Sequence, residues 1–159
     1  MNTPPARRQA LYTRLRVFPT SHLLAVIVCR LISEERRREY QLLFRIGTSK
    51  TLYGQEGFRD ALDQVDPDRP RSAYRRLKLI ESVTLMTAII IRFGAKNNTR
   101  KGASWVTEFA TSASMYGLQG TRDAMRMLIS EMDAQETHAL VREMRESGSH
   151  MAQFEQFGW

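Results

Sequence analysis

The sequence predicts an all-α protein built as a single helical domain. Its 159 residues are enough to bury one core. Apolar residues recur at three- and four-residue spacing along most of the chain, and no segment alternates apolar and polar residues as a strand would. Only "AIIIRF", residues 88–93, is β-branched enough to form a short strand instead. We therefore expect long buried helices with a basic arm, a basic loop and a helical C-terminal extension.

Residues 1–20 predict a basic N-terminal arm. Leu11, Leu15 and Phe18 recur at helical spacing, which indicates a short helix with one apolar side that ends at Pro19. The arm has four arginines and no acid, so it is a candidate for contacts with phosphate groups. These arginines are Arg7, Arg8, Arg14 and Arg16.

Residues 21–102 predict a helical core. A long helix is expected over residues 21–46 and another from Ser72, as its N-cap, to Gly94. A short helix and the linker "DPDRP" separate them. Both long helices are apolar on most sides, so we expect their faces to be shared between protomers of a homo-oligomer.

Residues 103–147 predict an acidic helical extension. Ser104 and Thr121 are the expected N-caps of two helices, and an amphipathic helix is expected over residues 134–145. Residues 148–159 predict a flexible tail that contains "GSHM", a string also found in expression vectors. No internal repeat is evident along the chain.

The charge is divided unevenly along the chain. The protein has 24 basic and 17 acidic residues, a net charge of +7 and a pI near 10.1. Residues 1–102 hold 20 cations and 9 acids, whereas residues 103–159 hold 4 and 8. This distribution favours a polyanionic partner. The longest apolar stretches are shorter than the roughly 20 residues of a membrane span, and no secretory signal is visible, so we expect a cytoplasmic protein without membrane contact.

The segment "IIIRFGAKNNTRKGASW", residues 89–105, is the strongest candidate for a DNA contact. It combines cations, amide side chains and two glycines with no acid, a composition suited to phosphates and base edges. The alternative is a solvated loop. The candidate residues are Arg92, Lys96, Asn97, Asn98, Arg100 and Lys101.

The sequence does not predict an enzyme, a cofactor or a metal site. It has three histidines, none spaced as a metal pair, and no phosphate-binding loop or dinucleotide-binding glycine pattern. The single cysteine, Cys29, lies in an apolar run, which is typical of a small core residue in a reducing compartment. A reactive thiol is the alternative.

Two stretches have the order of residues expected of a helix-turn-helix, whose second helix enters the major groove. They are residues 41–54 and 109–128. The second fits better because an apolar residue, Leu118, follows its turn glycine. The alternative is an ordinary connection between two helices, because helices joined at a glycine occur in most α-helical proteins. In "EERRREY", residues 34–40, the spacing of the charges predicts ion pairs on a solvated helix surface.

The run "HLLAVIVCRLISEERRREYQLLFRIG", residues 22–47, resembles the first long helix of the FlhD-type subunit of bacterial transcriptional activators. The segment "LKLIESVTLMTAIII", residues 77–91, is similar to a later helix of that family. The resemblance implies an all-helical subunit that dimerises through interlocked helices. It also implies a zinc-binding FlhC-type partner, promoter DNA as the ligand and recruitment of RNA polymerase. This chain lacks zinc ligands of its own.

Two functions are compatible with these features. The first is a DNA-binding transcriptional regulator, an activator subunit that acts in a complex. The second is a non-enzymatic adaptor of a conjugation, secretion or virion assembly that binds an acidic protein or RNA. RNA is the less favoured nucleic acid because the chain has neither an RRM-type aromatic motif nor a KH-type glycine loop.

Overall fold

The computed structural model describes residues 11–66, 68, 69, 72–94, 99–132, 138 and 142. Within these residues the chain forms helices and turns without a strand, which confirms the all-α prediction, and "AIIIRF" is part of a helix. The helices in this part of the chain are α1 (Leu11–Leu15), α2 (Thr20–Ser33), α3 (Arg37–Gly47), α4 (Gly54–Gln64), α5 (Ala73–Leu77), α6 (Ser82–Gly94), α7 (Arg100–Thr111) and α8 (Gly117–Ser130).

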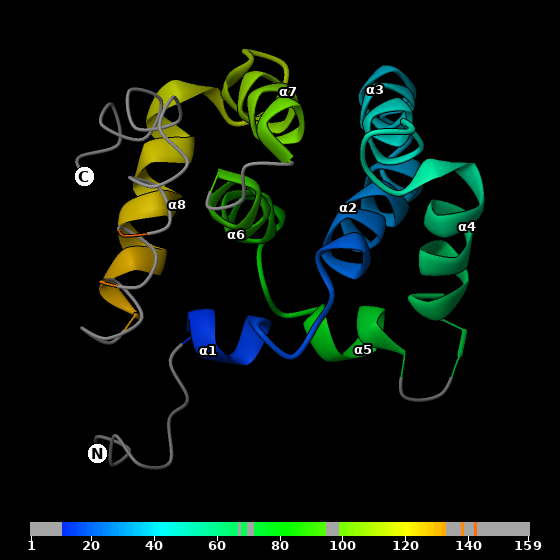
Figure 1. The fold of residues 1–159 in the computed structure, drawn as a ribbon, viewed down its shortest axis with the longest axis horizontal. Helices are drawn as coiled ribbons and strands as arrows, with labels where there is room; N and C mark the ends of the chain where they lie inside the picture. The colour runs from blue at the N-terminus through cyan, green and yellow to red at the C-terminus, as the bar shows by residue number, and fades with distance from the viewer. Residues whose placement is uncertain are drawn as a thin grey trace.

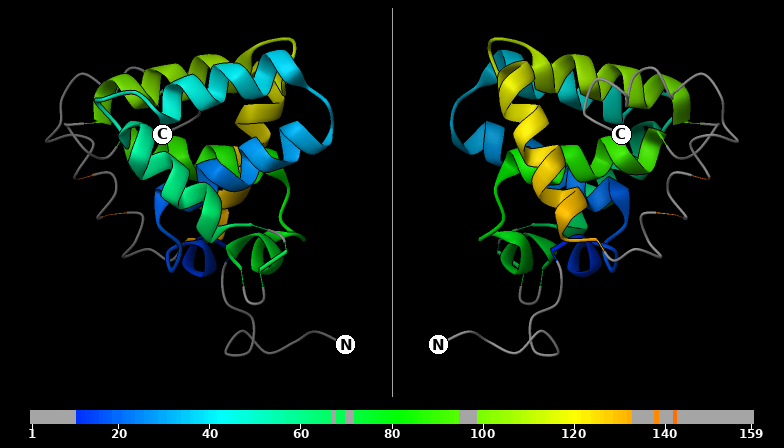
Figure 2. Two further views of the ribbon diagram at one scale, coloured as in Figure 1. Left: turned by 90° about the vertical axis from the view of Figure 1, so that its right-hand side faces the viewer. Right: turned by 90° about the vertical axis from the view of Figure 1, so that its left-hand side faces the viewer.

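The helices form three layers with two flanking helices. The central helices α2 and α6 contact each other in the middle of the molecule (Figure 1). Helices α3 and α7 lie together at one end, and the short helices α1 and α5 lie at the opposite end (Figure 2). Helix α4 packs on α2 at one flank, and α8 packs on α6 at the other.

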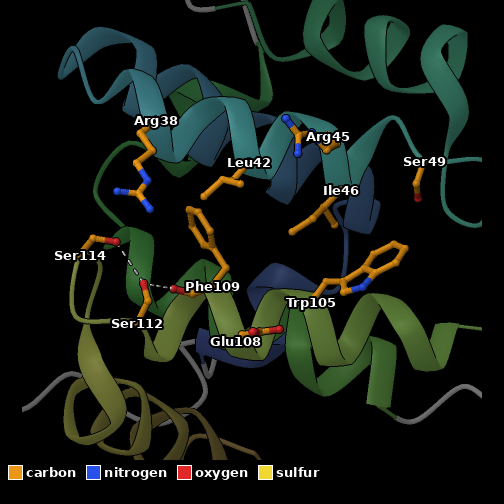
Figure 3. Close-up of a pocket in the computed structure, with 10 residues that line it drawn as sticks. All are labelled: Arg38, Leu42, Arg45, Ile46, Ser49, Trp105, Glu108, Phe109, Ser112 and Ser114. Carbon is orange, nitrogen blue, oxygen red and sulfur yellow. Dashed lines mark hydrogen bonds between the residues drawn. The ribbon is translucent and has the colours of Figure 1, made fainter.

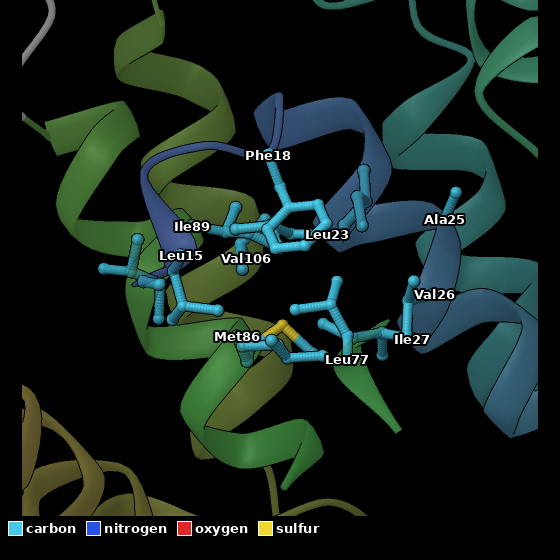
Figure 4. Close-up of a cluster of buried hydrophobic side chains, with 14 of the residues drawn as sticks. Leu15, Phe18, Leu23, Ala25, Val26, Ile27, Leu77, Met86, Ile89 and Val106 are labelled. Atoms are coloured by element: carbon cyan, nitrogen blue, oxygen red, sulfur yellow. The ribbon is translucent and has the colours of Figure 1, made fainter. Parts of the chain in front are cut away.

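The core is built from α2 and α6, which are apolar nearly all round. Residues 23–28 and 84–91 are all buried. Leu23 of α2 and Met86 and Ile89 of α6 belong to one cluster of buried side chains, part of which Figure 4 shows. Burial of each such large side chain stabilises the fold by about 1.5–3 kcal/mol. The faces that we expected to be shared between protomers thus cover each other within one chain.

The structure is a single helical domain, and the segment predicted as an extension completes its core. The predicted boundary between residues 102 and 103 falls inside α7. Val106, Phe109 and Leu128 from beyond that boundary are buried in the same core as α2 and α6. The final helix predicted over residues 134–145 and the tail, residues 148–159, lie outside the described residues, except for the exposed His138 and Arg142.

The prediction of one helix over residues 21–46 is wrong, because the chain turns at residues 34–36 between α2 and α3. Glu35 adopts a left-handed conformation with φ of 59°. No glycine or proline marks this break. It arises because α3 packs back on α2 and beside α7, and packing of this kind overrides local helix propensity.

The turn also changes the expected ion pairs. Arg38 is exposed and forms no ion pair with a described residue. The ion pairs predicted within "EERRREY" between Arg38 and the preceding glutamates therefore do not form. Arg36 instead binds Glu39 at 3.1 Å and donates a hydrogen bond to the carbonyl oxygen of Ser114. Arg36 thus ties the start of α3 to the turn that follows α7.

The helix predicted from Ser72 to Gly94 is also two helices, α5 and α6, separated at residues 78–81. Its two ends are confirmed. The Ser72 hydroxyl accepts a hydrogen bond from the backbone N–H of Arg75 at 3.3 Å, and α6 ends at Gly94. The predicted caps Ser104 and Thr121 are wrong, because α7 begins at Arg100 and α8 begins at Gly117.

An arginine of α6 holds the turn that leads into α2. The guanidinium of Arg92 donates to the carbonyl oxygens of Leu15 at 2.6 Å and Phe18 at 2.7 Å. It also donates to the hydroxyl of Thr20 at 3.2 Å. Carbonyl groups at a helix C-terminus carry partial negative charge, which stabilises a cation there. We call this arrangement the Arg92 clamp.

An arginine of α2 holds the turn that leads into α6 in the same way. Arg30 donates to the carbonyl oxygens of Leu77 at 2.8 Å and Ile80 at 2.7 Å. It donates as well to the hydroxyl of Ser82 at 3.0 Å. We call this arrangement the Arg30 clamp. Each central helix therefore binds, through its arginine, the turn that precedes the other central helix.

The two clamps show an internal repeat, which we interpret as a tandem duplication, so the prediction of no internal repeat is wrong. The three residues that accept hydrogen bonds in the Arg30 clamp lie 62 positions after their counterparts in the Arg92 clamp. Arg30 itself lies 62 positions before Arg92. The counterparts are Leu15 and Leu77, Phe18 and Ile80, Thr20 and Ser82, and Arg30 and Arg92. We call residues 11–64 the first repeat and residues 73–130 the second repeat.

The second parts of the two repeats are also similar in sequence, at a separation of 63 residues. Residues 48–62, "TSKTLYGQEGFRDAL", and residues 111–125, "TSASMYGLQGTRDAM", share eight of fifteen residues. In both, a glycine with positive φ starts the last helix, Gly54 at 71° and Gly117 at 74°, a conformation that glycine adopts readily. Helix α2 corresponds to α6 and helix α3 corresponds to α7, and the two members of each pair contact each other. These contacts indicate an approximate twofold axis between the repeats (Figure 1).

Candidate nucleic-acid interface

Exposed cations gather on the short helices α1 and α5 and on the turns that follow them. Both helices lie at the same end of the molecule, opposite α3 and α7 (Figure 2). No acid occurs in residues 11–18 or 72–80, although the exposed Glu81 follows the second segment. We call this surface the α1–α5 face. Its exposed cations are Arg14, Arg16, Arg75, Arg76 and Lys78.

The duplication explains why both helices are basic. Arg14 and Arg16 of the first repeat match Arg76 and Lys78 of the second, 62 positions later. The guanidinium of Arg76 lies 4.6 Å from the ring centroid of Phe18, in the turn after α1. This contact joins α5 to the first repeat, so the cations of both repeats share one surface.

The predicted N-terminal contacts fall partly on this face. Arg14 is exposed on α1, and Arg16 is exposed in the turn directly after it. Arg7 and Arg8 precede α1 and lie outside the described residues. The structure thus places two of the four predicted arginines on the α1–α5 face, where they stand beside cations of α5.

The structure changes the expectation for Arg92. Its guanidinium forms the Arg92 clamp and is largely buried, so its donors are already used inside the protein. Burial lowers the pKa of Arg92, while the charge and hydrogen bond of Tyr12 and the charge of Tyr53 raise it. Arg92 is therefore not a candidate for contact with phosphate groups.

The other residues of the predicted basic loop are divided. Arg100 and Lys101 are exposed in the first turn of α7, in the layer opposite the α1–α5 face. Lys96, Asn97 and Asn98 lie outside the described residues. Because α6 ends at Gly94 and α7 begins at Arg100, the connection is much shorter than the loop that we predicted from the sequence.

A groove of about 520 Å³ lies between α3 and α7, at the other end of the molecule (Figure 3). Its apolar surface comes from Leu42 and Ile46 of α3 and from Trp105 and Phe109 of α7. The remaining lining side chains are polar or charged. They are Arg38, Arg45, Ser49, Glu108, Ser112 and Ser114.

The groove lies on the approximate twofold axis. Most of its lining residues occur as pairs from matching positions, 63 residues apart in the two repeats. These pairs are Leu42 with Trp105, Arg45 with Glu108, Ile46 with Phe109, and Ser49 with Ser112. An apolar groove with charged edges is suited to a helical peptide, whereas phosphate binding requires mainly cations.

The two helix-turn-helix candidates are the same part of the two repeats. They correspond to α3 with α4 and to α7 with α8. The second helix of the first candidate exposes Glu56, Asp60 and Asp63 against one arginine, Arg59. In the second candidate, Arg126 lies 3.8 Å from Asp123. Neither helix therefore has the excess of exposed cations that the α1–α5 face has.

The described residues provide no group of three His, Cys, Asp or Glu side chains arranged to hold a metal ion. Cys29 is half-buried and packs against the core. Burial, followed by the charge of Asp66, raises the pKa of its thiol. The thiol therefore stays protonated near neutral pH, and a protonated thiol is a poor nucleophile.

No protein-family model, curated protein or solved structure matches this chain. The resemblance to FlhD-type subunits therefore stays a prediction. In the part of the chain that the structure describes, none of the helices has both the length and the hydropathy needed to cross a bilayer.

Sequence reasoning missed Arg75, Arg76 and Lys78 as candidate phosphate contacts, because we assigned them to the interior of one long helix. A usable signal was present. The segment "YTRLRVF", residues 12–18, and the segment "YRRLKLI", residues 74–80, match in residue type at five of seven positions, all except Thr13 with Arg75 and Phe18 with Ile80. Recognition of that similarity identifies both the duplication and the second half of the basic face.

Proposed function

We propose that the protein is a DNA-binding regulatory subunit that acts by binding and without catalysis. The observation that supports this function is the α1–α5 face, where two matching helices and the turns after them present five exposed cations. Four of the five are arginines, whose planar donor groups suit phosphate oxygens. The face contacts the DNA backbone, and the central helices α2 and α6 hold its two halves in register.

The resemblance to FlhD-type subunits supports a more specific role. In this role the protein is a cytoplasmic activator subunit that binds promoter DNA together with an FlhC-like partner. In this role the partner supplies the zinc site. DNA is preferred over RNA because the chain has neither an RRM-type aromatic motif nor a KH-type glycine loop.

The test is fluorescence anisotropy of a labelled random duplex, titrated with the full chain at several salt concentrations. About four phosphate contacts predict that log K falls with log[salt] with a slope of roughly −4. The triple variant R14A/R76A/K78A should lower the magnitude of the slope by about two to three. A matched RNA duplex in the same titration measures the preference for DNA.

The matched control removes the same charge from the opposite layer. The triple variant R37A/R38A/R45A changes three exposed arginines of α3 and should leave the slope nearly unchanged. Equal losses in both variants would show that only net charge matters. Absence of duplex binding at low salt would overturn the proposed function.

A second candidate function is an adaptor that binds an acidic protein partner. The groove between α3 and α7 favours it, because its apolar surface is edged by two exposed arginines, Arg38 and Arg45, against one exposed acid, Glu108. Neither arginine forms an ion pair with another described residue. An amphipathic helix with acidic flanks would satisfy both features.

A further inference from the structure

Two aliphatic side chains project from the α1–α5 face into solvent. Leu79 is 90% exposed and Val17 is 67% exposed, more than any other large apolar side chain in the described part of the protein. Single exposed apolar residues are common on protein surfaces. These two, however, lie at matching positions of the two repeats, 62 residues apart, so the same feature occurs twice.

Both side chains sit on rigidly held turns. Val17 lies between the carbonyl groups of Leu15 and Phe18, which the Arg92 clamp binds together. Leu79 has the same position in the Arg30 clamp, between the bound carbonyl groups of Leu77 and Ile80. A partly buried guanidinium therefore binds the backbone on both sides of each exposed aliphatic side chain.

Each exposed aliphatic residue directly follows a cation. Arg16 precedes Val17, and Lys78 precedes Leu79. Proteins that bend DNA use this combination, because an apolar side chain partly unstacks two base pairs while nearby cations hold the adjacent phosphates. The kink in the DNA then brings more of its backbone within reach of the protein surface.

We propose that Val17 and Leu79 act as a pair of apolar wedges that insert between base pairs and bend the bound duplex. This inference rests on the proposed function, since it requires that the α1–α5 face binds DNA. The two clamps give the wedges the rigidity that insertion needs. The duplication supplies one wedge from each repeat, so the bend has two kinks related by the approximate twofold axis.

A membrane surface is the other polyanion that combines with cations and exposed aliphatic groups. The area of the two side chains argues against it. Together they contain about seven carbons, roughly half of one myristoyl chain, and a single myristoyl chain gives only marginal membrane binding. Insertion into a base step needs only a small wedge at each site.

The test measures bending and affinity separately. Fluorescence energy transfer between dyes at the two ends of a duplex of about 30 base pairs reports bending, and anisotropy of the same duplex reports affinity. The intact protein should raise the transfer efficiency on binding. The double variant V17S/L79S should lose most of this rise, bind several-fold more weakly, and keep the salt slope because its cations are unchanged. Each single variant should lose about half of the rise.

Two matched variants make the result interpretable. I32S and L118S also replace exposed apolar side chains, 50% and 43% exposed, at the C-terminal end of α2 and the N-terminal end of α8, and they should bend DNA like the intact protein. Circular dichroism verifies that all variants fold. Binding without any rise in transfer, or an unchanged rise in V17S/L79S, would overturn the wedge inference but not the proposed function. Failure to bind the duplex at low salt would overturn both. Wedge-dependent binding to phosphatidylserine vesicles, but not to the duplex, would assign the face to membranes.

Discussion

Arg30 and Arg92 make the same three hydrogen bonds from opposite halves of the chain. Each guanidinium reaches two carbonyl oxygens and one hydroxyl in the turn that enters the other central helix. Neither bonds a carboxylate among the described residues, so helix-end carbonyl groups stabilise both charges. This reciprocal exchange interlocks the two repeats.

We predict that loss of either clamp destabilises the protein. R92A and R30A should each lower the free energy of unfolding by about 1–3 kcal/mol, because three partly buried acceptors lose their donor. R92K should recover little, since one ammonium group cannot match the planar fork of donors. Urea denaturation measures these changes. The control R45A removes an exposed arginine and should change stability by less than about 0.5 kcal/mol. A similarly small effect in R92A would contradict the role of the clamp.

The duplication predicts that the two repeats reassemble after the chain is cut between them. Residues 66–70 connect α4 to α5, and a cut there breaks no helix. Co-expressed halves should associate, because α2 and α6 bury each other and each clamp spans both halves. Size-exclusion chromatography and circular dichroism of the co-purified pair test this prediction. Each half expressed alone should be poorly folded, and a stable, monomeric single half would argue against interlocking.

Tyr53 and Tyr116 occupy matching positions but have different environments. The buried hydroxyl of Tyr53 has no hydrogen-bond partner among the described residues, whereas that of Tyr116 bonds Ser82. At pH 7, Y53F should therefore be neutral or slightly stabilising, and Y116F should lower the free energy of unfolding by about 1 kcal/mol. Thermal unfolding of the two variants compares them directly. An equal loss in both would contradict the difference in hydrogen bonding.

The same tyrosines predict loss of stability at alkaline pH. Burial raises the pKa of both hydroxyl groups above the usual value near 10. Between the unfolded and the folded pKa, the folded state holds more protons than the unfolded state, so stability falls as pH rises through about 10. Urea midpoints measured from pH 8 to pH 11 should show this fall. The double variant Y53F/Y116F should flatten it, and an unchanged slope would assign the fall to other groups.

The groove between α3 and α7 predicts selective binding of acidic helices. A fluorescein-labelled peptide with leucines at helical spacing and glutamates beside them should bind, and its lysine counterpart should not. L42D places a charge in the groove and should weaken binding at least tenfold. The control L118D alters a similarly exposed leucine on α8 and should have little effect. Equal binding of both peptides would contradict charge selection and weaken the adaptor function.

Several features follow from the sequence alone because they depend on neighbouring residues. Helical spacing predicted the all-α fold, Ser72 marked the start of a helix through its own hydroxyl, and Gly94 marked an end. The excess of cations in residues 1–102 is likewise a property of composition. These signals are local, and tertiary packing did not change them.

Tertiary structure decided where the long helices break and which arginines stay at the surface. No local signal marks the turn at Glu35, since the break depends on packing against distant helices. Arg14 and Arg92 look alike in the sequence, yet one is exposed and the other binds carbonyl groups 74 and 77 residues away. The partner of a guanidinium is set by which backbone carbonyls the fold brings within reach, and only the packed chain determines that.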